Sequence, residues 1–141
     1  METAWMVVSL VRQIAAYIWA GPNTLLGLAA GLVMLVFGAA ARRIQGAIEF
    51  SGGAIGLLLS SPLQPFRFQA VTFGHVILGT SAAALAGARE HEQVHVRQYE
   101  QWGPFFLPAY LASSVWQLVI GGHVYHDNYF ERQAVESGVR R

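Results

Sequence analysis

The chain has 141 residues, which suits one compact domain. It is 54% hydrophobic and only 12% charged, whereas soluble domains usually carry about 25% charged residues, so a lipid bilayer or a large partner surface is indicated. Cysteine is absent, which excludes disulfides and thiolate metal sites, and a net charge of +1 without an arginine stripe argues against nucleic acid.

The first apolar stretch, residues 4–20, has helical periodicity. Apolar side chains recur on one face, while Ser9, Arg12 and Gln13 interrupt the rest of the circumference. Gly21-Pro22-Asn23 then has the composition of a turn. We therefore predict a helix here that either crosses a membrane or lies at its surface.

The second apolar stretch, residues 24–41, carries no charge and approaches the length of about 20 residues that a membrane span needs. Gly27 and Gly31 form a pair that would let another helix pack closely. Arg42 and Arg43 follow at once, and basic residues beside a span favour the cytoplasmic side. We predict a helical hairpin over residues 1–43 in the inner membrane, with the remaining chain facing the cytoplasm.

A β-compatible region follows the two arginines. Residues 43–50 and 54–60 are short runs on either side of Ser51-Gly52-Gly53, which favours a hairpin turn. Residues 66–73 and 75–80 predict further strands, with Gly74 as a bulge between them. These runs predict a small antiparallel β-sheet.

The last part of the chain predicts helices. Ser81 is a good N-cap for a helix that runs to Trp102 and ends at Gly103-Pro104. A third apolar stretch covers residues 104–120, and a short helix covers residues 129–138. The predicted fold class is α+β: the membrane hairpin, the small sheet, an active-site helix and two further helices. Residues 44–141 would form the second domain.

The motif His91-Glu92-Gln93-Val94-His95 lies on the helix predicted after the sheet. Residues i and i+4 share a helix face, so the imidazoles of His91 and His95 can reach a single ion. Glu92 is rotated by about 100° from His91, which places it beside that ion. This is the HExxH pattern of zinc peptidases, in which the glutamate is the general base.

Two histidines require a third ligand. A further histidine six residues after His95 is excluded, because that position is Gln101. Glu131 on the last helix is the best candidate, although Asn128 and Glu131 also form the pattern of a capping box. Glu136, about one helical turn further on, is the second choice.

The loop before the last helix offers other donors. His123, His126 and Asp127 could complete the metal site in a different arrangement, or serve only as loop residues and caps. Alternatively, the histidines or Tyr125 and Tyr129 could hydrogen-bond the tetrahedral intermediate of peptide hydrolysis. The residues alone leave these roles open.

Two polar residues elsewhere have weaker predicted roles. His75, in a predicted strand, is expected to be a structural residue, since single strand histidines usually are. Gln98 lies two helical turns after His91 on the same face, where it can hydrogen-bond an imidazole or a ligand carboxylate.

The chain resembles the gluzincin clan of zinc metallopeptidases, in particular short bacterial zincin-like proteins with HExxHxxQ followed by an ExxA helix. The resemblance covers roughly residues 70–135, and its motifs are 70–77 (AVTFGHVI), 91–98 (HEQVHVRQ), Gly103-Pro104, Tyr110 and 128–134 (NYFERQA). It implies that His91, His95 and Glu131 are zinc ligands and that Glu92 is the base. Val135 stands where membrane proteases of the clan often have aspartate.

We therefore expect a membrane-associated zinc metalloendopeptidase that hydrolyses peptide bonds through a zinc-activated water. Its cofactor would be Zn²⁺, and its partners would be the lipid bilayer and a peptide or membrane-protein substrate, with no nucleic acid. A substrate peptide would pair with the sheet edge nearest the active-site helix. The alternative is a non-catalytic membrane protein with a structural zinc site. The oligomeric state is left open.

Overall fold

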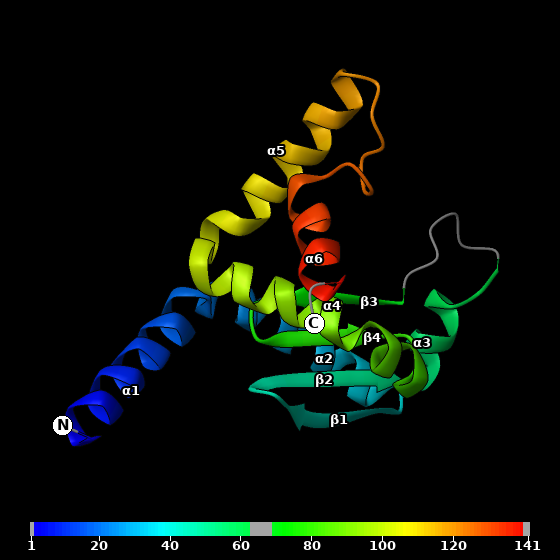
Figure 1. The fold of residues 1–141 in the computed structure, drawn as a ribbon. Helices are drawn as coiled ribbons and strands as arrows, with labels where there is room; N and C mark the ends of the chain where they lie inside the picture. Colours follow the sequence, from blue (N-terminus) through cyan, green and yellow to red (C-terminus); the bar gives the residue numbers. More distant parts are fainter. Residues whose placement is uncertain (1, 63–68, 140–141) are drawn as a thin grey trace.

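A computed structural model describes residues 2–62 and 69–139, and the fold is α+β (Figure 1). Helices precede, interrupt and follow a four-stranded sheet. In chain order the elements are α1 (Glu2–Trp19), α2 (Gly21–Val36), β1 (Ala39–Ile44), β2 (Ala47–Gly52), α3 (Gly53–Leu59), β3 (Ala70–Phe73), β4 (Val76–Gly79), α4 (Ala82–Trp102), a 3₁₀ turn (Gly103–Phe105), α5 (Phe106–Val119) and α6 (Tyr129–Val139).

The sheet has the strand order β1-β2-β4-β3 and is mixed. β1 pairs with β2, and β3 with β4, as antiparallel hairpins, but β2 and β4 are parallel, with Ile48 opposite Val76. The prediction of an antiparallel sheet was therefore wrong at this central pair. The reason is the crossover from β2 through α3 to the far edge, which brings β4 back beside β2 in the same direction.

The first hairpin turns at Gln45 and Gly46, whose positive φ values of 52° and 83° suit a two-residue turn. The predicted turn at residues 51–53 was wrong, because Gly52 closes β2 and Gly53 begins α3. Residues 54–60 form most of this helix and its C-cap, whereas we predicted a strand. Gly74 (φ 60°) is in the turn between β3 and β4 and is not a bulge. Residues 66–68, the first three of the strand predicted over 66–73, lie outside the described residues.

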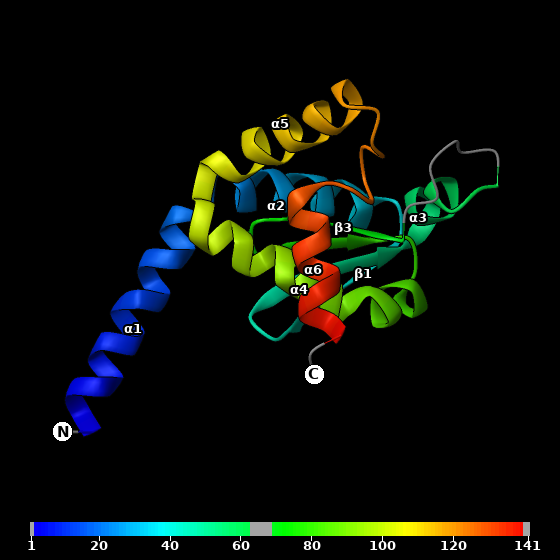
Figure 2. The same cartoon turned by 45° about the horizontal axis from the view of Figure 1, so that its top comes forward.

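Helices cover both faces of the sheet (Figures 1 and 2). Alternate strand residues point to opposite faces, so β2 and β4 each contribute to two cores. The core beneath α2 contains Met34, Phe50 and Val76. The core beneath α4 contains Ala47, Ile77, Leu85 and Val96. The sheet is thus buried between α2 and the helix that carries the HExxH motif.

The structure does not support a membrane span in α2. Gly27 and Gly31 face the sheet, where a Cβ on Gly27 would lie 2.7 Å from Val76 Cβ and one on Gly31 would overlap the Phe50 ring. The predicted helix over 24–41 is also too long, because residues 39–41 belong to β1. Among the described residues no single helix has the length and hydropathy to cross a bilayer, and the pair α1 and α2 that would suffice together bends by 64°.

α1 projects from the rest of the molecule and packs against it near its C-terminal end (Figures 1 and 2). The Tyr17 ring stacks on His75 with centroids 3.9 Å apart, and its hydroxyl donates to Gly46 O at 2.7 Å. Trp19 donates to Gln101 O at 3.3 Å, and Ala20 is fully buried. Residues 3–15 are exposed on all sides. The predicted boundary between residues 43 and 44 falls within β1, and the two-domain division stays a prediction.

Candidate metal centre

The helix that carries the HExxH motif forms as predicted. The Ser81 side chain accepts from Ala84 N at 3.0 Å, and α4 runs from Ala82 to Trp102 before Gly103 stops it with a φ of 56°. His91 and His95 lie one turn apart on the side of α4 that meets α6. Local spacing therefore explains how two of the predicted ligands come together.

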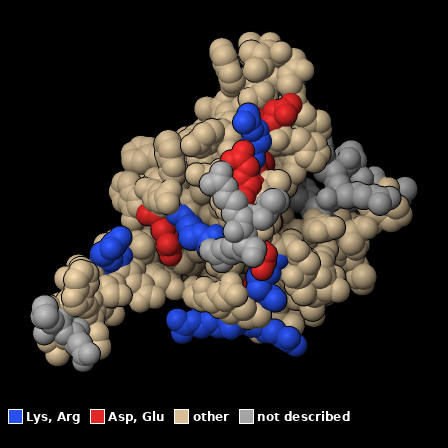
Figure 3. All heavy atoms as spheres, viewed as in Figure 1, with Lys and Arg blue, Asp and Glu red and all other residues tan. Residues whose placement is uncertain are grey.

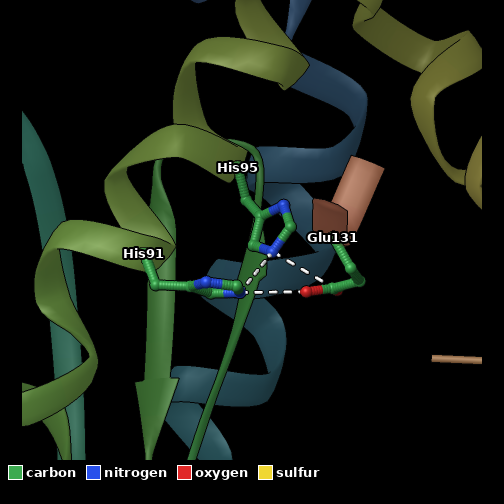
Figure 4. Close-up of side chains that lie close together, drawn as sticks. All are labelled: His91, His95 and Glu131. Atoms are coloured by element: carbon green, nitrogen blue, oxygen red, sulfur yellow. Dashed lines mark hydrogen bonds and ion pairs between the residues drawn. The ribbon is translucent and has the colours of Figure 1, made fainter. Parts of the chain in front are cut away.

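The side chains of His91, His95 and Glu131 converge on one point (Figure 4). His91 Nε2 lies 3.1 Å from His95 Nε2 and 2.9 Å from Glu131 Oε2, and His95 Nε2 lies 3.4 Å from Glu131 Oε1. Within the described ranges, this is the only group of three or more histidine or acidic side chains close enough to share an ion. The structure thus brings the three predicted ligands together.

These distances fit a tetrahedral metal ion. Two donors that each lie about 2.1 Å from zinc are separated by about 3.4 Å across a tetrahedral edge. The three donor separations of 2.9–3.4 Å are close to that edge. Two imidazoles and one carboxylate also match the ligand set of catalytic zinc sites that keep a position for water. His91 is 26% exposed, so the site opens toward solvent on its side.

Glu131 is directed to the histidines and not to its own helix start. The capping bond at the N-terminus of α6 is made by Asn128, whose Oδ1 accepts from Phe130 N at 2.9 Å. Asn128 is fully buried, and its amide also donates to Tyr110 O and Ser114 Oγ. Asn128 thus caps and anchors α6, which leaves the carboxylate of Glu131, 4% exposed, free to face α4.

The electrostatics of the cluster favour a charged carboxylate. Burial alone would raise the pKa of Glu131, but the hydrogen bonds from His91 and His95 outweigh it and hold the pKa well below its usual 4.5. Burial alone would lower the pKa of His95, but the hydrogen bond and charge of Glu131 prevail and raise it above 6.5. Protons and a metal ion would therefore compete for the same nitrogen.

Two tyrosines border Glu131. Tyr110 donates to Glu131 Oε1 at 2.6 Å, and Tyr125 also approaches the carboxylate. Burial, followed by the interaction with Glu131, raises the pKa of both phenols, so both remain protonated donors. The Tyr110 hydrogen bond fixes one carboxylate oxygen, which orients the other toward His91.

Gln98 links the two helices that carry the ligands. Its Oε1 lies 2.8 Å from His95 Nδ1, and its Nε2 donates to Phe130 O and Gln133 Oε1 on α6. Because an amide oxygen can only accept, the contact keeps a proton on His95 Nδ1, so Nε2 is the ring nitrogen that faces Glu131 and could bind an ion. Gln98 is 2% exposed, and it makes the hydrogen bond to an imidazole that its position on the helix predicts.

Glu92 is buried beside the cluster, with 6% exposure. Thr72 on β3 donates to Glu92 Oε2 at 2.6 Å. No donor to the other carboxylate oxygen occurs in the part of the chain that the structure describes, so Oε1 is free to accept from water. Thr72 was not anticipated from the sequence, because an inward-facing threonine on a short strand carries no local signal of this role.

The other candidate ligands lie outside the cluster. His123, His126 and Asp127 are exposed in the loop before α6, where they hydrogen-bond one another's backbone. His123 Nδ1 accepts from the backbone N–H groups of Tyr125 and His126, and Asp127 accepts from His123 N. Glu136 is exposed on α6 and takes no part in the cluster.

His75 is a structural residue in its contacts. It is 4% exposed, lies beneath the Tyr17 ring, and places Nε2 2.9 Å from Glu100 Oε1. Its backbone N–H donates to Thr24 Oγ1 at 3.1 Å. His75 lies in the turn between β3 and β4, and these contacts tie that turn to α1, α2 and α4, in agreement with the structural role expected from the sequence.

Comparison with known proteins found no relative of this chain. No protein-family model matches it, and neither a curated protein nor a solved structure matches it. Support for any function therefore comes from the residues of the cluster and from the motif.

Proposed function

We propose that the protein is a membrane-associated zinc metalloendopeptidase of gluzincin type. His91, His95 and Glu131 would hold the ion, and Glu92 would act as general base. The observation that carries the proposal is the convergence of these three donors at 2.9–3.4 Å beside a buried glutamate that follows the first ligand directly.

Zinc fits the donor set better than the harder or softer metals. Calcium and magnesium prefer an all-oxygen shell, and copper(I) prefers sulfur, whereas two imidazoles with a carboxylate suit zinc. When bound, zinc would polarise the scissile carbonyl and lower the pKa of a water molecule to about 7. Gln98 and Tyr110 keep the ligands oriented for this role.

Glu92 supplies the proton transfers in the proposed reaction. Thr72 holds Oε2, so Oε1 can accept a proton from the attacking water and deliver it to the leaving amine. Tyr125, whose phenol stays protonated, can donate to the substrate carbonyl oxygen from the Glu131 side. Glu92 would thus supply general acid–base catalysis, and Tyr125 would supply electrostatic stabilisation.

The substrate would be a peptide or a membrane protein bound along β3. This strand is an edge of the sheet and carries Thr72, which contacts the proposed base. An extended peptide can add to such an edge through main-chain hydrogen bonds. Tyr99 already donates to Thr72 O at 3.1 Å, so that carbonyl is engaged within the chain and an added strand would use other backbone groups of β3.

The bilayer is the proposed partner of the apolar helices. Large side chains are exposed along α1, the outer face of α2 and the length of α5, including Trp5 (74%), Val36 (82%) and Val119 (72%). A soluble monomer rarely exposes contiguous apolar patches larger than a few hundred Å². We propose that these helices rest in the inner membrane with the site toward the cytoplasm, the side favoured by Arg42 and Arg43.

The deciding experiment compares Glu92→Gln with His95→Ala. We expect purified wild-type protein to hold one zinc per chain and to cleave members of a peptide library. Glu92→Gln should retain zinc but lose cleavage by at least about 100-fold. His95→Ala should lose both. Glu90→Gln, an exposed glutamate two residues away, is the matched control and should retain both.

A structural zinc site is the alternative, and one observation favours it. The cluster joins α4 to α6, and Gln98 reinforces the same junction, so an ion there would staple the two helices. Zinc that raises the melting temperature of a wild-type protein with no cleavage activity would support this alternative. Absence of stoichiometric zinc would contradict both.

A further inference from the structure

A second polar site lies between α1 and α4, away from the metal cluster. It is a hollow of about 710 Å³ that opens to solvent. Its polar walls come from Arg12 and Gln13 of α1 and from Arg97, Glu100 and Gln101 of α4, and Trp19 lies at its edge. The helices therefore bring two guanidinium groups from distant parts of the chain to one cavity.

The two arginines lack acidic partners. Neither Arg12 nor Arg97 forms an ion pair within the described residues, whereas Arg89 on the same α4 holds Glu49 with two bonds of 2.8 and 2.9 Å. Figure 3 shows basic side chains over α1 and α4 on one face of the molecule, with an acidic side chain between them. Unpaired guanidinium groups that share a hollow are suited to a phosphate group, which they can bind with paired hydrogen bonds.

Glu100 also lines the hollow, but its carboxylate pairs with His75. Its spacing from Arg97 is i to i+3, which permits an ion pair on a helix surface. Instead Glu100 Oε1 lies 2.9 Å from His75 Nε2, and Tyr17 stacks on that histidine. The carboxylate thus pairs with His75 and not with either arginine, and two guanidinium groups against one carboxylate leave the hollow a net positive charge.

The surroundings of the hollow match a lipid. Arg12 follows a helix segment whose side chains Val7, Val8 and Val11 are 60%, 51% and 59% exposed. Trp19, 44% exposed, lies on the same helix, and tryptophan favours the interface between acyl chains and water. Arginine can lay its aliphatic stem along such an apolar surface while its charge stays with the headgroups.

We propose that the hollow binds the phosphate headgroup of an anionic phospholipid, with the acyl chains along the exposed face of α1. Arg12 and Arg97 contact the phosphate, and Trp19 marks the depth of the interface. The site orients the chain on the membrane and holds α1 against α4. This inference rests on the membrane association proposed above, and it is independent of the peptidase activity.

The test is vesicle co-sedimentation of the full-length protein. Wild-type protein is compared on vesicles of phosphatidylcholine alone and on vesicles that also contain phosphatidylglycerol, at physiological salt. We expect tighter binding to the anionic vesicles. Arg12→Gln with Arg97→Gln should weaken that binding by about thirtyfold, since each arginine near an anionic surface accounts for about fivefold.

The matched control is Arg132→Gln, compared with Arg97→Gln alone; it removes the same single charge from α6, outside the hollow. An equal loss in these two single variants would overturn the site, because it would show attraction by net charge alone. Unchanged zinc content and circular dichroism confirm that the Arg12 and Arg97 variant is folded; if it is not, the conservative pair Arg12→Lys and Arg97→Lys should show intermediate binding.

The remaining outcomes separate this inference from the proposed function. Equal wild-type binding to both vesicle types would overturn the headgroup site and leave membrane association standing. No binding to any vesicle would overturn membrane association and the headgroup site together. Binding of inorganic phosphate by calorimetry, lost in the double variant and without preference for anionic vesicles, would overturn the lipid in favour of a free anion.

Discussion

The α4–α6 junction and the projecting α1 differ in how their side chains are satisfied. At the junction, Glu131 and Gln98 are almost fully buried, and their polar atoms have partners at 2.6–3.4 Å. Along α1, residues 3–15 are exposed although most of them are apolar. The side chains of the junction thus find their partners within the chain, whereas the apolar side chains of residues 3–15 remain exposed.

This difference predicts that substitutions in the two regions will have different effects. Removing one member of a buried polar network destabilises the folded state, because the remaining groups are left without hydrogen bonds. Replacing an exposed apolar side chain usually changes the free energy of unfolding by no more than about 0.5 kcal/mol. We therefore expect substitutions at the junction to alter metal binding and folding, and substitutions on α1 to alter only association with membranes.

The largest effect is expected at Gln98. Gln98→Ala should lower zinc affinity by about 10- to 100-fold, because His95 loses the acceptor that sets its tautomer. Gln98→Glu should keep the affinity within about tenfold of wild type, since a carboxylate also accepts from Nδ1. Competition with a chromophoric chelator measures both. Equal losses in the two variants would show that Gln98 acts only through α6.

Zinc affinity should also fall as the pH is lowered. The raised pKa of His95 means that this side chain keeps its proton above pH 6.5, so zinc must displace it. Below the pKa, apparent affinity should fall by about tenfold per pH unit for each displaced proton. The same chelator competition from pH 8 to pH 5 measures the slope, and a flat profile would contradict histidine ligation.

In the metal-free protein the folding stability, unlike the zinc affinity, should decrease as the pH rises above 6.5. The raised pKa of His95 contributes stability that is present below pH 6.5 and lost as pH rises through the folded value. The lowered pKa of Glu131 contributes stability that is present above pH 4.5 and lost as pH falls through the folded value. In the metal-free protein the contact between His95 and Glu131 should therefore stabilise the fold most between pH 4.5 and pH 6.5. Thermal melts in the presence of a chelator measure this.

The inner face of α2 should behave as core. Gly31→Ala should destabilise the protein by about 1–3 kcal/mol, because the new methyl group meets the buried Phe50 ring. Gly87→Ala on α4, where nothing lies within 4 Å, is the matched control and should stabilise by up to about 1 kcal/mol. Chemical denaturation measures both. A neutral Gly31→Ala would show that α2 does not pack on the sheet.

The smallest effect on folding is expected on α1. Val7→Gln with Val11→Gln should change the free energy of unfolding by no more than about 0.5 kcal/mol, because both side chains are about 60% exposed. The same pair should weaken binding to vesicles. Substantial destabilisation in denaturant would mean that α1 packs against another part of the protein in solution.

The helix that carries the HExxH motif was predicted well from local sequence signals. The N-cap Ser81, the stop at Gly103 and the helical register of His91 and His95 all depend on neighbours within one or two turns, and the structure confirms them. The preference of residues 54–60 was misjudged, because a short apolar run suits a strand or a helix equally until its surroundings are known.

The meaning of the glycines in α2 depended on tertiary contacts. Gly27 and Gly31 were expected to admit another helix in a membrane, but they admit the sheet. Apolar composition and small residues do not distinguish a helix that meets lipid from one that covers strands. The partner decides, and the partner lies far along the chain.

By itself the sequence determined the two histidines, the adjacent glutamate and the helix that presents them, because helix geometry is set by hydrogen bonds four residues apart. Only the tertiary structure decided that Glu131 faces the histidines, and that Thr72 and Tyr110 donate to the carboxylates of Glu92 and Glu131. Such contacts join residues that are distant in the chain, and the packing of α4 against β3 and α6 establishes them.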